Sequence, residues 1–388
     1  MLFITSIRNK KINSVSLDYI RKRTMAVEDP ELFLRTHDVP LIIDEFQYAP
    51  NLLSYIKIRI DEARKNELFE AGKKIGTLYY LTGSQVFETM EDVSESLAGR
   101  IGIVDLHPLS TRELNGVLEE EFIPDIEILK NKQLVKKESS KKIFQRIFKG
   151  SYPELYKNPK IDIEMFYSSY LRTYIERDVR KIINVQNESK FIKFISSVAA
   201  RTGEEYNASD IAEDVGVDNQ TVDKWISVLI NTYIIFLLQS HINNNVGRVV
   251  KRPKIYFMDT KLAWFLTGYV DAGTLERSAY SGHIFETYVI SEIVKSYTNN
   301  NKDSKKHLYY YRDSNKKEID LLVINGDNIY PVEIKKSANP GYDSIKNFDI
   351  VSKFEMETPN GIVLCLTESI HPLDENNYLV PIEYIKKN

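Results

Sequence analysis

An apolar run that ends in two carboxylates is the first feature of the sequence that could do chemistry. The run Leu41–Ile43 has the composition of a buried strand, and Asp44 and Glu45 follow it directly. In phosphoryl transfer the first such carboxylate can hold the water shell of Mg²⁺, and the second can orient or deprotonate the attacking water. The alternative is a strand end at which Asp44 only caps the next turn. Asp44 is therefore a candidate metal ligand, and both residues are candidate catalytic groups.

Polar residues also follow the next expected strand, Thr77–Leu81, at Thr82, Ser84 and Gln85. The carboxyl ends of neighbouring parallel strands line the crevice in which α/β sheets bind ligands. These side chains could therefore sense the γ-phosphate of a nucleotide. Arg100, further along the chain, is a cation suited to stabilising the charge of phosphoryl transfer, including across a subunit boundary.

A second set of charged residues lies in an expected hairpin near the C-terminus. With a loop of four residues, 325–328, the register places Asp320 opposite Glu333, with Cβ atoms about 5 Å apart. Lys335 then emerges on the same face as Glu333. Opposed carboxylates suit Mg²⁺ or Mn²⁺, and a nearby lysine can hold a scissile phosphate or the attacking water. The alternative is a pair of solvated acids at a sheet edge, since Glu-x-Lys triplets are common.

The elements around these residues alternate between strand and helix up to about Leu114, which favours a mostly parallel α/β sheet. From Lys130 to Lys149 a basic run predicts a solvated helical connector. Residues 161–240 are expected to be helical throughout. From residue 254 onward strands and helices alternate again.

A helix-turn-helix pattern is embedded in the helical region, with Gly216 in the turn and a second helix from about residue 219. The stretch Ile234–Leu238, the turn Asn243–Gly247 and the stretch that follows would supply a wing. Lys224 is the candidate DNA contact on the second helix, although acidic neighbours disfavour phosphate binding by that helix. The alternative is a module that only packs against the rest of the protein.

Composition limits the remaining possibilities. The chain has 388 residues, and 52 Lys+Arg against 55 Asp+Glu give a net charge of −3, so any nucleic-acid contact must come from local patches. One cysteine, Cys365, excludes an intramolecular disulfide framework and a zinc site built from several cysteines. No targeting segment is visible, and the longest apolar run, Tyr233–Leu238, is far short of the roughly 18 residues of a membrane span. We expect a cytoplasmic protein that does not enter a membrane.

Taken together, these residues resemble the bacterial and archaeal AAA-type ATPases that carry a nuclease-like C-terminal domain of unknown function. The matching stretches run in the family's order along nearly the whole chain, and they are 28–34, 41–47, 81–85, 94–100, 152–154, 172–179, 256–260, 312–320 and 333–335. The resemblance implies binding of ATP with Mg²⁺ at Asp44 and Glu45, and assembly into a homo-oligomer. It also implies a restriction-endonuclease-like fold near the C-terminus, in which Glu286 would join Asp320 and Glu333 as a metal ligand.

The family's phosphate-binding loop, Walker A, lies upstream of a strand like Val15–Leu17, and the sequence contains no G-x-x-x-x-G-K-[S/T]. Without that loop the backbone N–H groups and the lysine that cradle phosphates are missing. We therefore expect impaired ATP hydrolysis, with the chain being either a fragment or a protein that has lost the activity.

The predicted architecture is a multidomain α/β protein with four parts. These are a truncated parallel-sheet P-loop core of the AAA type at 1–115, a helical lid or connector at 116–190, a winged helix-turn-helix at 191–253, and a restriction-endonuclease-like α/β domain at 254–388. The leading functional prediction is an ATP-binding protein of the AAA class that acts on or near DNA. The alternatives are a Mg²⁺-dependent DNA nuclease that uses the C-terminal residues, and a non-enzymatic regulator that binds DNA or protein.

Overall fold

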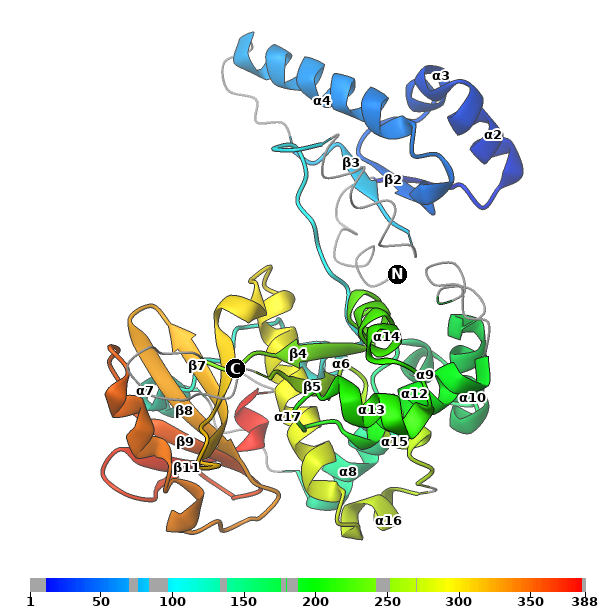
Figure 1. Ribbon diagram of the computed structural model, residues 1–388. Helices are drawn as coiled ribbons and strands as arrows, with labels where there is room; N and C mark the ends of the chain where they lie inside the picture. Colours follow the sequence, from blue (N-terminus) through cyan, green and yellow to red (C-terminus); the bar gives the residue numbers. More distant parts are fainter. Residues whose placement is uncertain are drawn as a thin grey trace. The chain divides into compact units, whose positions relative to one another are not determined.

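The computed structural model describes residues 12–69, 76–83, 97–132, 138–175, 179, 188–241, 252–269 and 271–385. The chain divides into two compact units, unit 1 at residues 1–103 and unit 2 at residues 104–388 (Figure 1). Among the described residues, no helix combines the length and the apolar composition that crossing a membrane requires.

Unit 1 is built on a parallel sheet of three strands, and this confirms the expected strand–helix alternation. The sheet has the order β1 (Asn13–Ser16), β2 (Leu41–Asp44) and β3 (Tyr79–Leu81). Its helices are α2 (Ile20–Glu28), α3 (Pro30–Arg35) and α4 (Leu52–Phe69), with a short 3₁₀ turn η1 (Phe46–Tyr48).

The start of α3 shows how the sequence sets these elements. Asp29 caps the helix by accepting a hydrogen bond from the Leu32 backbone N–H, and Pro30 takes the first helical position, where no N–H is needed. The apolar side of α3 and the strand Leu41–Ile43 are buried in one core with the first turns of α4. This core therefore fixes the position of the carboxyl end of β2.

Unit 2 is helical over its first half. Its helices are α6 (Thr111–Leu114), α7 (Ile126–Asn131), α8 (Ser140–Lys149), α9 (Glu154–Lys157), α10 (Ile163–Tyr174), α12 (Glu188–Ala200), α13 (Ala208–Val215), α14 (Asn219–Asn231), α15 (Thr260–Leu266), α16 (Ala272–Arg277) and α17 (Ser281–Thr298). In the basic run, α8 forms as a helix, but it is not simply solvated: Ile143, Phe144 and Ile147 are fully buried.

The predicted helix-turn-helix elements are present as α13 and α14. Gly216 ends α13 in the left-handed conformation (φ 73°), which glycine adopts without strain. A short antiparallel pair follows, β4 (Ile235–Leu238) with β5 (Lys254–Phe257). The predicted wing turn at 243–247 lies outside the described residues.

A six-stranded mixed sheet forms the second half of unit 2. Its order is β10 (His371–Pro372), β11 (Asn377–Pro381), β9 (Gly361–Cys365), β8 (Asn328–Ile334), β7 (Glu318–Asn325) and β6 (Leu308–Arg312). Strands β8, β9 and β11 are parallel, and β6, β7 and β8 are antiparallel neighbours.

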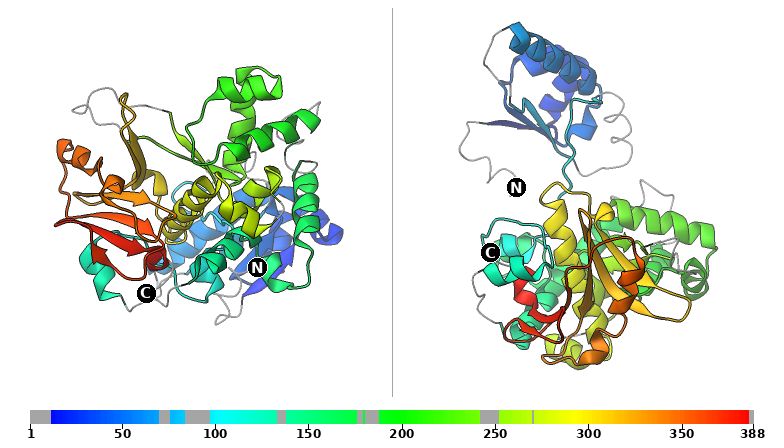
Figure 2. Two further views of the ribbon diagram at one scale, coloured as in Figure 1. Left: turned by 90° about the horizontal axis from the view of Figure 1, so that it is seen from below. Right: turned by 90° about the vertical axis from the view of Figure 1, so that its left-hand side faces the viewer.

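This sheet is covered on both faces. Leu321, Val323 and Val332 belong to the large core that contains the buried side of α17, whereas Leu322 and Val363 pack with a 3₁₀ segment, η5 (Phe348–Lys353). Figure 2 gives two further views of the sheet and of the long helix α17 beside it. Helix α17 thus brings its side chains close to β5 and to the strand pair β7–β8.

Candidate functional site

The carboxyl edge of the unit 1 sheet brings together two of the predicted residues. Asp44 is the last residue of β2 and pairs in register with Ser16 of β1, and its side chain is exposed. The Thr82 hydroxyl, just past β3, donates a hydrogen bond to the Asp44 carboxylate. The Thr82 backbone N–H also donates to the Ile43 carbonyl at 3.0 Å. Adjacent parallel strands therefore place a carboxylate and a hydroxyl side by side, as the spacing predicted.

Glu45 and Gln47 complete this edge. Glu45 has a left-handed backbone (φ 54°), which is uncommon for a residue other than glycine and is often associated with function. The Gln47 side-chain amide donates to the Glu45 carboxylate. Within the described part of the chain Gln47 Oε1 is buried and has no hydrogen-bond partner. A Cβ atom added at Gly83 would lie 2.3 Å from that oxygen.

Gln47 is the residue that sequence reasoning missed. The only sequence signal was the glycine that follows β3, because a glycine there leaves room for another side chain. An unpartnered buried acceptor next to Glu45 is the observation that fits a metal-bound water at this edge. Asp44, Glu45 and Thr82 offer the oxygen atoms that Mg²⁺ prefers.

Arg100, a further residue predicted at the nucleotide site, has a carboxylate partner within unit 1. Arg100 binds Asp61 of α4 in a two-pronged ion pair, with Nε–Oδ1 at 2.6 Å and Nη2–Oδ2 at 3.0 Å. This hydrogen bond raises the pKa of Arg100 and lowers that of Asp61. Among the described residues, the Arg100 side chain also donates a hydrogen bond to the Ala98 carbonyl. Ser84 and Gln85 lie outside the described residues.

The β7–β8 hairpin brings together three of the residues predicted near the C-terminus. Ile324 pairs with Ile329, as predicted, so the register that sets Asp320 opposite Glu333 is confirmed. The loop has two residues, 326–327, rather than the four predicted, because Asn325 and Asn328 also pair. The register is unaffected, since both loops are centred on the same point.

Lys335 joins the two acids. Its Nζ lies 2.6 Å from Glu333 Oε1 and 3.7 Å from Asp320 Oδ2. Asp320 Oδ2 also accepts the Ile334 backbone N–H at 2.8 Å. All three side chains are thus held at the point where β8 ends.

Burial and like charge dominate the electrostatics of this group. Burial, with the Asp320 charge adding to it, raises the pKa of Glu333 to about 8 despite the opposing effect of Lys335. Burial also raises the pKa of Glu286, and here Lys254 opposes the shift while Asp320 adds to it. Burial tends to lower the pKa of Lys335, but the charges of Asp320 and Glu333 outweigh it and raise that pKa.

Glu286 does not share a cation position with Asp320 and Glu333. It lies on α17, where its Oε1 is 3.3 Å from Lys254 Nζ and accepts the Tyr256 hydroxyl at 2.6 Å. Over the described ranges, no three His, Cys, Asp or Glu side chains are arranged to hold one metal ion. The metal set of three acids inferred from the resemblance is therefore not assembled: Asp320 and Glu333 fit a divalent cation as a pair, and Glu286 is engaged elsewhere.

Lys224 is exposed on α14, as a DNA contact would have to be. Its surroundings are acidic: Asp218 caps the same helix, and Asp223 precedes it and accepts the Tyr206 hydroxyl at 2.5 Å. DNA binding at this helix stays a prediction.

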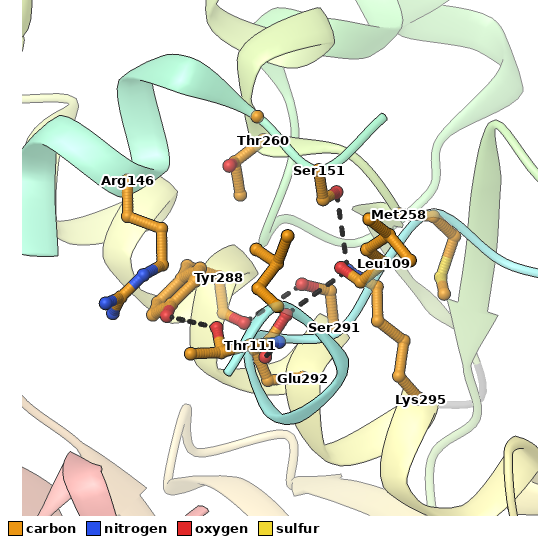
Figure 3. Close-up of a pocket in the computed structure, with 12 residues that line it drawn as sticks. Leu109, Thr111, Arg146, Ser151, Met258, Thr260, Tyr288, Ser291, Glu292 and Lys295 are labelled. Carbon is orange, nitrogen blue, oxygen red and sulfur yellow. Dashed lines mark hydrogen bonds and ion pairs between the residues drawn. The ribbon is translucent and has the colours of Figure 1, made fainter. Parts of the chain in front are cut away.

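A polar cavity in the interior of unit 2 was not predicted (Figure 3). Glu292 accepts the Thr111 backbone N–H at 2.6 Å, and Lys295 contacts Glu292 Oε1 and the Leu109 carbonyl, both at 3.2 Å. Tyr288 lies 2.9 Å from the Thr111 hydroxyl, oxygen to oxygen. The cavity measures about 10 Å³, room for about one water molecule. It therefore belongs to the packing of the interior.

Three family models match the chain. An AAA domain matches residues 1–115, a domain of unknown function (DUF8612) matches 140–272, and another domain of unknown function (DUF4143) matches 281–385. The first match agrees with the parallel sheet and the acidic strand end of unit 1. The first part of the chain is thus similar to an AAA domain, and the last part is similar to a domain of unknown function.

Two relatives match along most of the chain. They are the uncharacterized proteins Mb2031c of Mycobacterium bovis and Rv2008c of Mycobacterium tuberculosis. Each is 22% identical over 357 residues, which cover 92% of this chain and 71% of the relative. Among solved structures, protein VC1899 from Vibrio cholerae aligns with 97% of this chain and 94% of its own, at 12% identity and a TM-score of 0.20. A similarity that low carries no conclusion about fold.

Proposed function

We propose that the protein binds ATP with Mg²⁺ at the carboxyl edge of the unit 1 sheet, and that its hydrolysis is impaired. The observation that carries the proposal is the hydrogen bond from Thr82 to Asp44, between the ends of two neighbouring parallel strands. Ligands of α/β sheets bind at this edge. The match of residues 1–115 to an AAA domain supports the same conclusion.

The roles follow from the contacts. Asp44 would hold the water shell of Mg²⁺, with its carboxylate oriented by Thr82. Glu45 would orient the attacking water, and Gln47 fixes the Glu45 carboxylate. The magnesium ion, when bound, supplies positive charge for the phosphates. Residues 1–388 contain no Walker A pattern, so this stretch by itself is expected to bind ATP weakly and to hydrolyse it slowly.

Equilibrium binding of a fluorescent ATP analogue in the presence of Mg²⁺ tests this proposal. Asp44→Ala should weaken binding at least tenfold, whereas Glu62→Ala, which removes an exposed carboxylate from α4 of the same unit, should leave it unchanged. Equal binding by wild type and Asp44→Ala, or no binding by wild type, would refute the proposal.

A Mg²⁺-dependent DNA nuclease is the second candidate, favoured by the contact of Lys335 with both Asp320 and Glu333. The two carboxylates would hold the cation, and the ammonium group would hold the scissile phosphate. Nicking of a supercoiled plasmid in Mg²⁺ or Mn²⁺ tests it. Glu333→Ala should abolish nicking and Glu375→Ala, an exposed acid on the β10–β11 turn, should not. Wild type that cleaves no DNA in either metal rules the nuclease out.

A further inference from the structure

A buried lysine lies between two acids next to the β7–β8 hairpin. Lys254 opens β5, and only 4% of its side chain is exposed. Its Nζ lies 2.5 Å from Glu318 Oε1 and 3.3 Å from Glu286 Oε1. The Tyr256 hydroxyl donates to the same Glu286 oxygen at 2.6 Å. The ammonium group is thus the point on which two carboxylates from separate elements converge.

The wider group of charges is acidic. Arg312 lies 3.3 Å from Glu318 Oε2 and 3.5 Å from Glu205 Oε1. Five carboxylates therefore meet three cations in this group, which consists of Glu205, Glu286, Glu318, Asp320 and Glu333 with Lys254, Arg312 and Lys335.

Without Lys254, Glu286 and Glu318 would repel each other in a poorly solvated position. Removing one partner of a buried ion pair is strongly destabilising because the remaining charge loses its compensation. Burial tends to lower the pKa of Lys254, but the surrounding negative charge, that of Glu286 first, raises it well above its usual value. The surrounding carboxylates therefore favour the charged form of this side chain.

A divalent metal ion is the other chemical species that satisfies converging carboxylates, with oxygen ligands at about 2.0–2.6 Å. In this protein the chain itself supplies the charge. We propose that the Lys254 ammonium group takes the place of a divalent cation between Glu286 and Glu318. Glu286 is consequently withheld from any metal ion at Asp320 and Glu333, and that pair holds one metal ion at most.

Mn²⁺ binding to the full chain, counted by electron paramagnetic resonance of the free ion, tests this inference. Lys254→Met keeps the length of the side chain and removes its charge, and it should bind one more Mn²⁺ than wild type. The matched control is Lys346→Met, an exposed lysine of unit 2, which should bind as wild type does. Because the readout is a difference between variants, Mn²⁺ held elsewhere, including near Asp44, cancels.

The triple variant Lys254→Met, Glu286→Gln, Glu318→Gln should lose the additional ion, with the Mn²⁺ affinity of the gained position falling at least tenfold. If Lys254→Met is unfolded in chelator, recovery of its circular dichroism in Mn²⁺ is the expected sign of the gained site. A variant that binds no additional ion, or whose fold Mn²⁺ does not restore, overturns the inference. So does a wild type that loses a bound Mn²⁺ on Glu286→Gln. The inference requires no cleavage, so failure of the nuclease candidate leaves it intact.

Discussion

The Tyr167 hydroxyl donates a hydrogen bond of 2.9 Å to the carboxylate of Asp259 in the interior of unit 2. Asp259 is 1% exposed and also accepts the Ser151 backbone N–H at 2.6 Å, the Ser151 hydroxyl at 2.9 Å and the Leu262 backbone N–H at 2.8 Å. Burial raises the pKa of Tyr167, and the Asp259 charge adds to that shift. One carboxylate therefore connects α10, α15 and the turn before α9.

Asp259→Asn should destabilise unit 2 by about 2–4 kcal/mol. The NH₂ group of the asparagine would face an N–H or O–H group that now donates to the carboxylate, and that hydrogen bond would be lost. Asp271→Asn is the matched control, since Asp271 also caps a helix by accepting a backbone N–H, that of Thr274, but is exposed. It should lose no more than about 1 kcal/mol. Urea unfolding followed by circular dichroism measures both, and equal losses would contradict the role given to Asp259.

Gly150→Ala should be much more destabilising than Gly268→Ala. Both glycines have φ near +80°, a backbone conformation that other residues rarely adopt. At Gly150 the added Cβ would also lie 2.1 Å from the Tyr167 hydroxyl and 2.7 Å from Lys261 Cβ, whereas at Gly268 no atom lies within 4 Å. We expect a difference of at least about 2 kcal/mol in the free energy of unfolding. A difference near zero would mean that the interior can yield there.

Glu333→Gln should remove a pH dependence of stability. The folded pKa of Glu333 is about 8 and its ordinary value is 4.5. Between these values the folded chain binds a proton that the unfolded chain has lost, so this group makes stability fall as pH rises, with a slope of about 1.4 kcal/mol per pH unit. Glu333→Gln should therefore gain stability relative to wild type from pH 5 to pH 8. Denaturant unfolding at several pH values would detect this, and parallel curves would contradict it.

His107 makes the free energy of unfolding depend on pH in the opposite sense to Glu333, and His107→Phe should remove that dependence. Burial, aided by the Lys295 charge, lowers the pKa of His107 to about 4, and neither ring nitrogen has a hydrogen-bond partner among the described residues. Between pH 4 and 6.5 the His107 imidazole is protonated in the unfolded chain and neutral in the folded chain. The free energy of unfolding therefore falls on acidification by up to about 3 kcal/mol. His107→Phe should lose this fall. His371→Phe, at a partly exposed histidine of unit 2, serves as the control and should keep it.

Local patterns predicted much of the fold. Strand β2 follows from an uninterrupted apolar run, the turn between α13 and α14 from Gly216, and the opposition of Asp320 to Glu333 from strand periodicity about a short loop. Each depends on residues close together in the sequence.

Long-range pairings could not be predicted in the same way. Arg100 is predicted at a nucleotide, and the sequence did not reveal its contact with Asp61, 39 residues earlier. Glu286 was expected at a metal ion, and it binds Lys254, 32 residues earlier. The sequence indicates which charged residues need a partner. Whether that partner is a charged side chain of the protein or a bound ligand depends on how distant helices and strands pack.

The segment between residues 109 and 138 has a consequence for synthesis of the chain. Three of its described backbone N–H groups donate to residues that come much later in the sequence: Thr111 to Glu292, Ile126 to Asn360, and Glu138 to Glu383, which is 245 residues further on. At about 5–20 residues per second, the ribosome needs about 12–50 s to supply that last partner. During that interval the apolar side chains of this segment, Phe122 and Leu129 among them, have no completed core to enter. We expect the nascent protein to depend on chaperones until its C-terminal strands emerge.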